Sequence, residues 1–496
     1  MANTIKYLNV EKAKLYKDSN SNTELMELLW GDRVELVSNT KVNGRYKVNA
    51  RWANNAYIDA DVLGDTSLLE LYFIDVGQGD GVLIITPDRK HILIDGGYKR
   101  SKQPHGKSAA DFVDWKFKKE YKQNTIELDA MICSHCDADH YGGLWDLINP
   151  DEREKKELDT TKTNVKNFYH AGISWWKNAE KSRFLGTEKD GAMYDLLTGK
   201  TSIKNGLKAS ASLKLQGEWA NFLSCIVETD AKIERLSYNP KKNFDYLPGF
   251  EANQPTSIKV LGPIETTIDG QATLKDLGTY DKNTNGNSVL LRVDYGRSRI
   301  LLTGDLNKKS QRHIIESLSG NKIELAADVV KACHHGSDDC SYEFLQYVNA
   351  AATVISSGDD ETHAHPRPNI VAASGVTGFQ KIENDEMVTP LIYSTEISRS
   401  LKIGDPYEVN SKDYDTADGK IDVLLTNEAK TNIRYKHTSS GALNPTDKSK
   451  TMNRLKVVDG IVYGLVNVRT DGHKILCATL NEGKSKWEIK TFYSRF

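Results

Sequence analysis

The run SHCDADHYGG at residues 134–143 constrains this chain more than any other segment. It directly follows an apolar stretch at Thr125–Ser134 that predicts a buried strand. It packs four potential metal ligands into six residues: His135, Asp137, Asp139 and His140. Such a group is costly to bury unless a cation pairs with it. Because neutral imidazole and ionised carboxylate are ordinary metal donors, the pattern predicts a divalent-metal site at the end of a strand.

The spacing within this run also indicates how the ligands divide. An alternating loop lets His135 and Asp137 point to one side, whereas Asp139 and His140 turn toward a second position at the start of a helix. The pair Gly142-Gly143 permits the close backbone approach that this arrangement requires.

Apolar segments before and after residues 150–255 predict the main architecture. Strands are expected at Leu69–Val76, Gly81–Thr86 and His91–Ile94, and again at Ser257–Leu261, Ser288–Tyr295, Arg299–Thr303, Val329–Ala332 and Thr353–Ser356. Strands that alternate with helices favour an α/β sandwich. Residues 150–255 are rich in lysine and irregular, so we interpret them as an insertion or cap.

The two ends of the chain read as β-rich additions. Residues 1–65 contain short alternating segments with an Asn43-Gly44 hairpin signal, and they resemble a bacterial SH3-like barrel. Such modules bind peptides or cell-wall glycans; the alternative is an appendage that packs on its neighbour. We assign residues 405–496 as an extension of the main domain, with a small extra domain as the alternative. Its strands are expected at Ile421–Leu425, Ile461–Val468, Lys474–Leu480 and Trp487–Phe492.

Charge and hydropathy exclude several classes of protein. The chain of 496 residues has 66 Lys and Arg against 68 Asp and Glu, so it lacks a strongly basic nucleic-acid coat. No apolar run approaches the ~20 residues of a membrane helix, and the first ten residues lack a signal pattern. Six cysteines are too few for a disulfide scaffold. We therefore expect a soluble, reduced, cytoplasmic protein without a membrane partner.

The metal motif resembles the H-x-[HD]-x-D-H signature of the metallo-β-lactamase superfamily. Further segments match in order: YFIDVGQGDGVLI with ILIDGG, NFYHAG, GNSVLLRVDYGRSRILLTGDL, VVKACHHGS and HAHPRP. The first pair looks like the opening of the hydrolase domain of competence-type (ComEC-like) DNA-uptake proteins. The resemblance implies an αββα sandwich over residues 68–404, and a dinuclear site of zinc or manganese.

The resemblance also assigns the ligands. His135, Asp137 and His170 would hold one metal; Asp139, His140 and His334 would hold the other, with Asp305 shared. Because Asp137 stands where the family often has His, the harder carboxylate shifts the preference toward manganese. Asp80 and Asp95 are expected to shape their loops or to hydrogen bond to a ligand histidine.

For some of these residues the sequence allows two roles. Neighbouring side chains in extended backbone point in opposite directions, so only one of His334 and His335 binds metal; we favour His334 and give His335 to orientation or substrate contact. His365 would lie near the substrate and, like His335, could protonate the leaving oxygen. His170 could instead be a structural histidine, and His365 a surface-loop residue. The predicted catalytic residues are Asp139, His335 and His365.

The resemblance implies a hydrolase in which a hydroxide bridging two metals attacks phosphorus or a carbonyl carbon. A phosphodiesterase or nuclease ranks first, with a phosphodiester or nucleic acid as substrate. Residues that could stack on bases and contact phosphates follow His170: Trp175, Trp176, Lys177, Lys181 and Arg183. The alternatives are an ordinary solvated cap, a hydrolase of another ester or a lactone, and a scaffold recruited by a protein partner through the SH3-like module, with a structural or regulated metal site.

Overall fold

The computed structural model describes residues 4–103, 106–149, 151, 157–358, 365–396, 431–437, 446–452, 464–481 and 486–496. The chain divides into two compact units, residues 1–398 with 463–496, and residues 399–462. The described part of the second unit is one antiparallel hairpin, β30 (Thr431–His437) with β31 (Thr446–Met452). The strand expected at Ile421–Leu425 lies outside the described residues.

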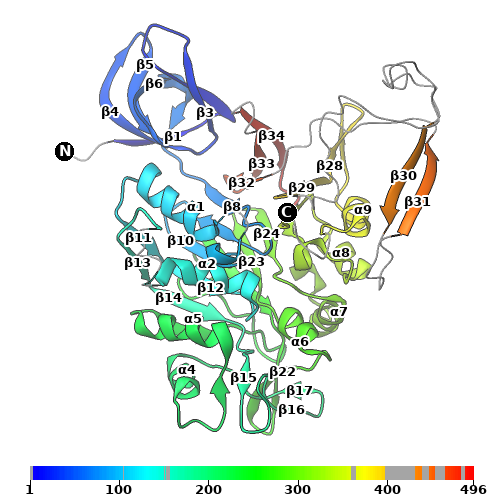
Figure 1. Ribbon diagram of the computed structural model, residues 1–496. Coiled ribbons are helices and arrows are strands. Elements are labelled where there is room, and N and C mark those ends of the chain that lie inside the picture. Colours follow the sequence, from blue (N-terminus) through cyan, green and yellow to red (C-terminus); the bar gives the residue numbers. More distant parts are fainter. Residues whose placement is uncertain are drawn as a thin grey trace. The chain divides into compact units, whose positions relative to one another are not determined.

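Two mixed sheets form the centre of the first unit (Figure 1). The nine-stranded sheet runs in the order β19 (Lys232–Arg235), β14 (Asn167–His170), β12 (Ala130–Cys133), β10 (His91–Ile94), β9 (Val82–Ile85), β8 (Leu69–Phe73), β32 (Val466–Thr470), β33 (Lys474–Asn481) and β34 (Lys486–Tyr493). The six-stranded sheet runs β20 (Thr256–Gly262), β23 (Leu290–Tyr295), β24 (Ser298–Leu302), β25 (Val329–Lys331), β26 (Ala352–Ile355) and β29 (Leu391–Ser394).

The two-residue period of the strands builds the layers. Ile84 of β9 packs into the core shared by the two sheets, while its neighbours Leu83 and Ile85 join a second core under helices. That second core uses α1 (Ala109–Trp115), α2 (Ala138–Ile148) and α5 (Gly217–Glu228). A third core joins the six-stranded sheet to α7 (Lys308–Ser317) and α8 (Tyr342–Val348). The expected α/β architecture with mixed sheets and helices is confirmed.

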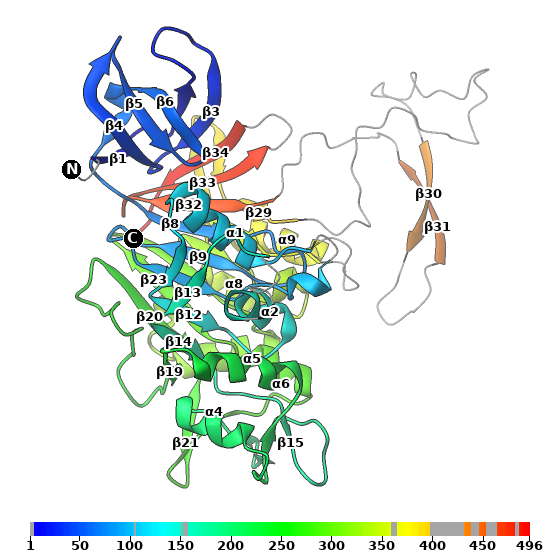
Figure 2. The same ribbon diagram turned by 60° about the vertical axis from the view of Figure 1, so that its left-hand side comes forward.

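Smaller elements complete the first unit. The hairpin β27 (Lys381–Glu383) and β28 (Glu386–Thr389) follows α9 (Pro368–Thr377), and β11 (Thr125–Leu128) pairs with β13 (Lys162–Val165). The expected insertion, residues 150–255, carries α4 (Lys200–Leu207), β15 (Trp176–Lys177), β16 (Glu188–Lys189), β17 (Ala192–Met193) and β18 (Lys214–Leu215). After it come β21 (Glu265–Ile268), β22 (Gln271–Lys275) and α6 (Tyr280–Gly286). In both ribbon views these elements lie at the end of the unit away from the N-terminal sheet (Figures 1 and 2).

The N-terminal segment forms a sheet of seven antiparallel strands. Their order is β3 (Glu24–Leu29), β2 (Lys12–Tyr16), β6 (Ala53–Asp59), β5 (Arg45–Ala50), β4 (Arg33–Val42), β1 (Ile5–Leu8) and β7 (Leu63–Gly64). Alternate residues such as Leu15, Val34 and Val48 fill a small core of its own. Since β3 and β7 remain its edges, no closed barrel is found among the described residues, and the SH3-like assignment stays a prediction.

This N-terminal sheet is packed on the C-terminal strands rather than joined by a free linker. Trp30 and Leu68 share a core with Leu476, Ala478 and Trp487. Beside them lies a group of buried, paired charges, here called the arginine cluster: Asp32, Arg51, Glu70, Tyr72, Lys116, Glu120 and Arg469.

The C-terminal strands belong to the main sheet. β32 pairs with β8 so that Val466 lies opposite Phe73, and β33 and β34 continue the sheet outward. Residues 463–496 thus belong to the first unit, and residues 399–462 form the second. None of the helices in the described residues is long and apolar enough to cross a membrane.

Candidate metal centre

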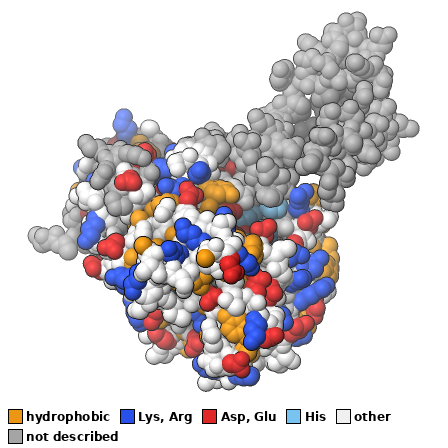
Figure 3. All heavy atoms as spheres, turned by 60° about the horizontal axis from the view of Figure 1, so that its bottom comes forward, with side chains coloured by type: hydrophobic (Ala, Val, Ile, Leu, Met, Phe, Trp, Pro, Cys, Tyr) orange, Lys and Arg blue, Asp and Glu red, His pale blue; other side chains and the backbone are white. Residues whose placement is uncertain are grey.

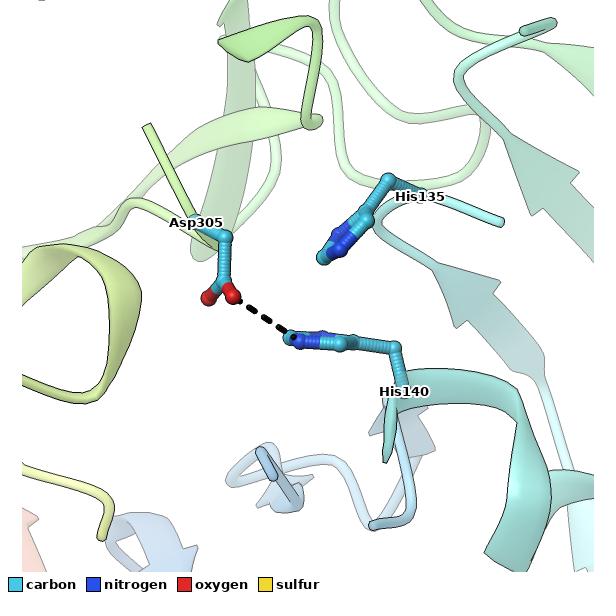
Figure 4. Close-up of side chains that lie close together, drawn as sticks. All are labelled: His135, His140 and Asp305. Carbon is cyan, nitrogen blue, oxygen red and sulfur yellow. Dashed lines mark ion pairs between the residues drawn. The ribbon is translucent and has the colours of Figure 1, made fainter. Parts of the chain in front are cut away.

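Three strands end at the same edge of the two sheets, and the loops after them carry the candidate ligands. His135 follows β12, Asp305 follows β24 and His335 follows β25. Figure 4 shows His135, His140 and Asp305 pointing toward one another, with an ion pair between His140 and Asp305. The carboxyl ends of neighbouring strands thus bring together residues that are up to 200 positions apart, as 135 and 335 are.

The start of α2 is held against a loop of the sheet. The amide of Gly96 donates to the carbonyl of His140 at 2.8 Å. A Cβ added at Gly143 would lie 2.0 Å from the carbonyl oxygen of Gly96, so only glycine fits this crossing. The close approach that the glycine pair predicted is confirmed, and it fixes His140 beside the edge of the sheet.

The ligand atoms converge closely. Oδ2 of Asp305 lies 3.2 Å from Nε2 of His140 and 3.0 Å from Nε2 of His335. The same His335 atom lies 3.6 Å from Oδ2 of Asp139, and the rings of His135 and His140 are 4.0 Å apart. Among the described residues, four sets of three have ligand atoms within 4.8 Å of one another: His135, His140 and Asp305; Asp139, His140 and His335; Asp80, Asp95 and His140; and Asp80, Asp305 and His335.

Several of these atoms are buried without a hydrogen-bond partner. They include Nε2 of His135, His140 and His335, and Oδ1 of Asp305. Buried polar atoms are normally satisfied, so a convergent group of unsatisfied donors and acceptors indicates a missing ligand. Imidazole nitrogens and carboxylate oxygens at this spacing fit a divalent metal.

Outer contacts orient the two central histidines. Nδ1 of His140 lies 2.9 Å from Oδ2 of Asp95, and Nδ1 of His335 lies 3.2 Å from the carbonyl oxygen of Ser356. Because these partners accept hydrogen bonds, Nδ1 carries the proton and Nε2 is left free to bind metal. The expected bond from Asp95 to a ligand histidine is confirmed.

The carboxylates dominate the electrostatics of the centre. Burial lowers the pKa of His140, but Asp305, Asp95 and Asp139 raise it well above its usual value. Burial raises the pKa of Asp139, but His140 and His335 bring it below its usual value. Each group thus favours its charged form because its neighbours carry the opposite charge.

Lys331 is a further member of the site that the sequence pattern did not single out. It is 2% exposed; its Nζ contacts Asp80, lies 3.6 Å from Oδ1 of Asp305 and donates to the carbonyl of Gly304 at 3.0 Å. Asp80 in turn lies 3.2 Å from Nδ1 of His335. A lysine at the end of an apolar run before tandem histidines was the available signal.

The positions of the tandem histidines differ from the prediction that His334 is the ligand. Both have left-handed backbones, with φ of 46° at His334 and 53° at His335, so the alternation of an extended strand does not apply. His335 is buried within the ligand group, whereas the side chain of His334 is 27% exposed and its Nε2 lies 3.9 Å from Asp305. The geometry thus favours His335, not His334, as the ligand.

Two other predicted ligands lie at the margin of the group. Asp137 is 3.5 Å from Nε2 of His135 and accepts a hydrogen bond from Thr284 at 2.8 Å. His170 ends β14 with both ring nitrogens buried and unpartnered, and burial together with Arg235 lowers its pKa to about 3. Neither belongs to the triads of ligand atoms within 4.8 Å.

His365 lies next to the tandem histidines. Its ring is 5.8 Å from that of His334 and 6.3 Å from that of His335, and it is 5% exposed. It is therefore brought to the site as a buried residue and not as part of an exposed surface loop. Histidine side chains reach the surface on the face shown in Figure 3.

Comparison with known proteins gives matches around this site. Residues 74–150, which include β9, β10, β12 and α2, match the model of the metallo-beta-lactamase superfamily. The resemblance extends to competence proteins: the chain is 36% identical over 96 residues to competence protein ComA of Neisseria gonorrhoeae, and 31% identical over 88 residues to ComE operon protein 3 of Bacillus subtilis. Each match covers 18% of this chain, and 14% and 11% of those relatives.

Similarity to solved structures is weaker in sequence identity. A metallo-beta-lactamase from Cronobacter sakazakii, a HARLDQ motif mutant, is 12% identical with a TM-score of 0.23, covering 54% of this chain and 77% of that chain. The CmlA beta-hydroxylase is 11% identical with a TM-score of 0.27, covering 60% and 47%. A protein of unknown function from Enterococcus faecalis is 12% identical with a TM-score of 0.25, covering 56% of each chain.

Proposed function

We propose that this protein is a hydrolase that uses two divalent ions, zinc or manganese, to cleave phosphodiester bonds. The observation that carries the proposal is the set of unpartnered Nε2 atoms that face Asp305 and Asp139 in a buried site. The similarity to competence proteins supports a phosphodiester or nucleic acid as the substrate.

The charge balance of the centre supports the number of ions. The carboxylates of the site are Asp80, Asp95, Asp137, Asp139 and Asp305. Lys331 is the fixed cation in contact with them among the described residues. A histidine that binds a metal through Nε2 is neutral, so with these ligands bound four negative charges would remain, and two divalent ions carry the same charge with opposite sign. An unbalanced buried charge of this size would otherwise be strongly destabilising.

The side chains divide the work as follows. His140, His335, Asp139 and Asp305 would hold one ion, and His135 with Asp137 and His170 would hold the other, Asp305 being shared. Asp95 keeps Nδ1 of His140 protonated. When bound, the ions act as Lewis acids on a phosphoryl oxygen and lower the pKa of water.

Proton transfer to the leaving group falls to the other histidines. His335 contacts Asp305 within the ligand group. His334 and His365, whose rings are 5.8 Å apart, therefore remain for contact with the substrate. Nε2 of His334 lies 3.3 Å from Nδ2 of Asn285, which would orient its ring. We assign substrate contact to His334 and protonation of the leaving oxygen to His365, the role in which a near-neutral group is effective.

Elemental analysis and substrate assays test this function directly. Protein loaded with manganese, zinc or magnesium is incubated with bis-p-nitrophenyl phosphate, single- and double-stranded DNA, RNA, and a panel of lactones and carboxyl esters. Two bound ions and turnover of diesters are expected. Turnover of a lactone or ester without turnover of any diester would overturn the proposal.

A further inference from the structure

An arginine outside the metal centre is held in a fixed orientation by aromatic rings. The Arg183 guanidinium lies 3.8 Å from the centre of the Trp175 ring, which is buried. Tyr280 meets the same indole edge-on, with ring centres 5.9 Å apart at 88°, and is 37% exposed. The stacked indole limits the freedom of the exposed guanidinium and leaves its N–H edge available.

This aromatic group adjoins the metal centre through α6. Tyr280 begins the helix, and Thr284, one turn later, donates to Oδ2 of Asp137 at 2.8 Å. Residues four apart lie on the same face of a helix. The next residue, Asn285, reaches His334. Tyr280 therefore stands about one helical turn, ~6 Å, from Thr284, which contacts the motif that holds the ligands, and Trp175 lies against Tyr280.

The side chain of Arg183 is exposed beside the buried Trp175 ring. Within the described part of the chain Arg183 makes no ion pair, whereas other arginines near the cores do, such as Arg235 with Glu265 at 2.5 Å. An oriented guanidinium without a carboxylate partner is suited to bind an anion in bidentate fashion.

We infer that Arg183 binds a phosphate of a nucleic-acid strand next to the phosphate that is cleaved, and that the exposed ring of Tyr280 stacks on the adjoining base. The inference rests on the proposed function and names its substrate class, a polynucleotide rather than a small diester. Phosphate contact by a planar guanidinium and base stacking on an aromatic ring are the usual means of holding single strands.

Variants of Arg183 test this with two readouts. The first is the binding of a fluorescein-labelled single-stranded oligonucleotide in EDTA, measured by anisotropy over a range of salt concentrations. The second is KM and kcat for that oligonucleotide and for bis-p-nitrophenyl phosphate. Arg183→Gln is expected to weaken oligonucleotide binding and to raise its KM about tenfold or more, with kcat for the small diester and the metal content unchanged.

Controls separate charge from geometry. Arg183→Lys keeps the charge but loses the planar fork, so it should recover only part of the binding. Lys189→Gln removes the same charge from an exposed residue of the same insertion and should have no effect. The salt dependence of log Kd should fall by about one unit of slope in Arg183→Gln.

The outcomes distinguish the two claims. If the wild type hydrolyses no diester, the proposed function fails, and the anisotropy measurement still decides on Arg183. If the wild type is active but Arg183→Gln and Lys189→Gln bind the oligonucleotide equally well, the inference is wrong. An equal loss of activity on both substrates would also overturn it, because that result would indicate a structural role.

Discussion

Two groups of buried charge lie in the first unit, and they differ in whether their polar atoms have partners. In the arginine cluster, Arg469 donates to Asn467, to the carbonyls of Leu29 and Trp30, and to Tyr72, and it pairs with Asp32 at 2.8 Å. In the metal centre, the Nε2 atoms of His135, His140 and His335 make no hydrogen bond, although those of His140 and His335 face the Asp305 carboxylate. Burial of charge alone therefore does not mark a functional site; unsatisfied atoms that converge do so.

The charges differ in the same way. Asp32, Glu70 and Glu120 of the arginine cluster are matched by Arg51, Lys116 and Arg469. The metal centre has five carboxylates against Lys331. The first cluster closes the contact between the N-terminal sheet and the C-terminal strands, and the second has the excess of carboxylates that suits it to bind cations. Substitutions in each should therefore fail in different ways.

The largest effect is expected at the shared carboxylate. Asp305→Ala removes the residue that faces both His140 and His335, so at least one equivalent of metal should be lost and kcat should fall about 10³-fold. Elemental analysis and diester assays measure this, and circular dichroism should show a folded chain. Full metal content would contradict the site, and retained binding to an isolated protein partner would favour the scaffold hypothesis.

Arg469→Met should mainly affect stability. It leaves Asp32 and Glu70 buried without their partner, which costs about 3–5 kcal/mol of unfolding free energy. Urea denaturation measures the loss, with Arg312→Met on the exposed face of α7 as a control. Metal content per folded molecule should not change. A drop in metal content at full stability would mean that the two clusters are not separate.

The tandem histidines give a matched pair inside the metal centre. His335→Ala should lower metal affinity at least about 100-fold, since even outer-shell partners of metal ligands contribute 10- to 100-fold. His334→Ala should retain the metal and instead raise KM. Metal titration with a competing chelator compares the two. If His334→Ala loses the metal and His335→Ala keeps it, the sequence-based preference for His334 is right after all.

The smallest effect is a pH dependence in the arginine cluster. Burial raises the pKa of Asp32, but the charges of Arg51 and Arg469 outweigh burial and lower this pKa to about 2. A lowered pKa stabilises the fold above the unfolded value near 4, and this contribution, about 2 kcal/mol, is lost as the pH falls from 4 toward 2. Urea unfolding at a series of pH values should show this acid loss in the wild type. Asp32→Asn should be less stable at neutral pH and should show a smaller loss.

Much of the centre was predictable because its residues follow strands. The sequence placed His135, His140 and Asp305 in one site, and the structure brings them together. Which of His334 and His335 faces the ligand group was not predictable, because it depends on left-handed backbone at two non-glycine residues. Lys331 was missed because its position before the tandem histidines is a weak signal, and its contacts with Asp80 and Asp305 come from distant parts of the sequence.

The fold, like the site, has features that local sequence predicts and features that depend on distant residues. Short apolar segments predicted the strands near β9, β10 and β24, because each run of buried residues is visible locally in the sequence. The division at residues 399–462 could not be read in this way, since it depends on which tail strands pair with β8. Pairing across such a distance has no local signal.

That pairing has a consequence for biosynthesis. Asn467 hydrogen-bonds to the carbonyl of Leu71 across 396 positions, and Arg469 reaches under the N-terminal sheet. As the polypeptide emerges from a ribosome, β8 must wait with one edge open until residues beyond 460 are translated. An unpaired edge is prone to intermolecular association, so nascent chains stalled before that point should depend on chaperones.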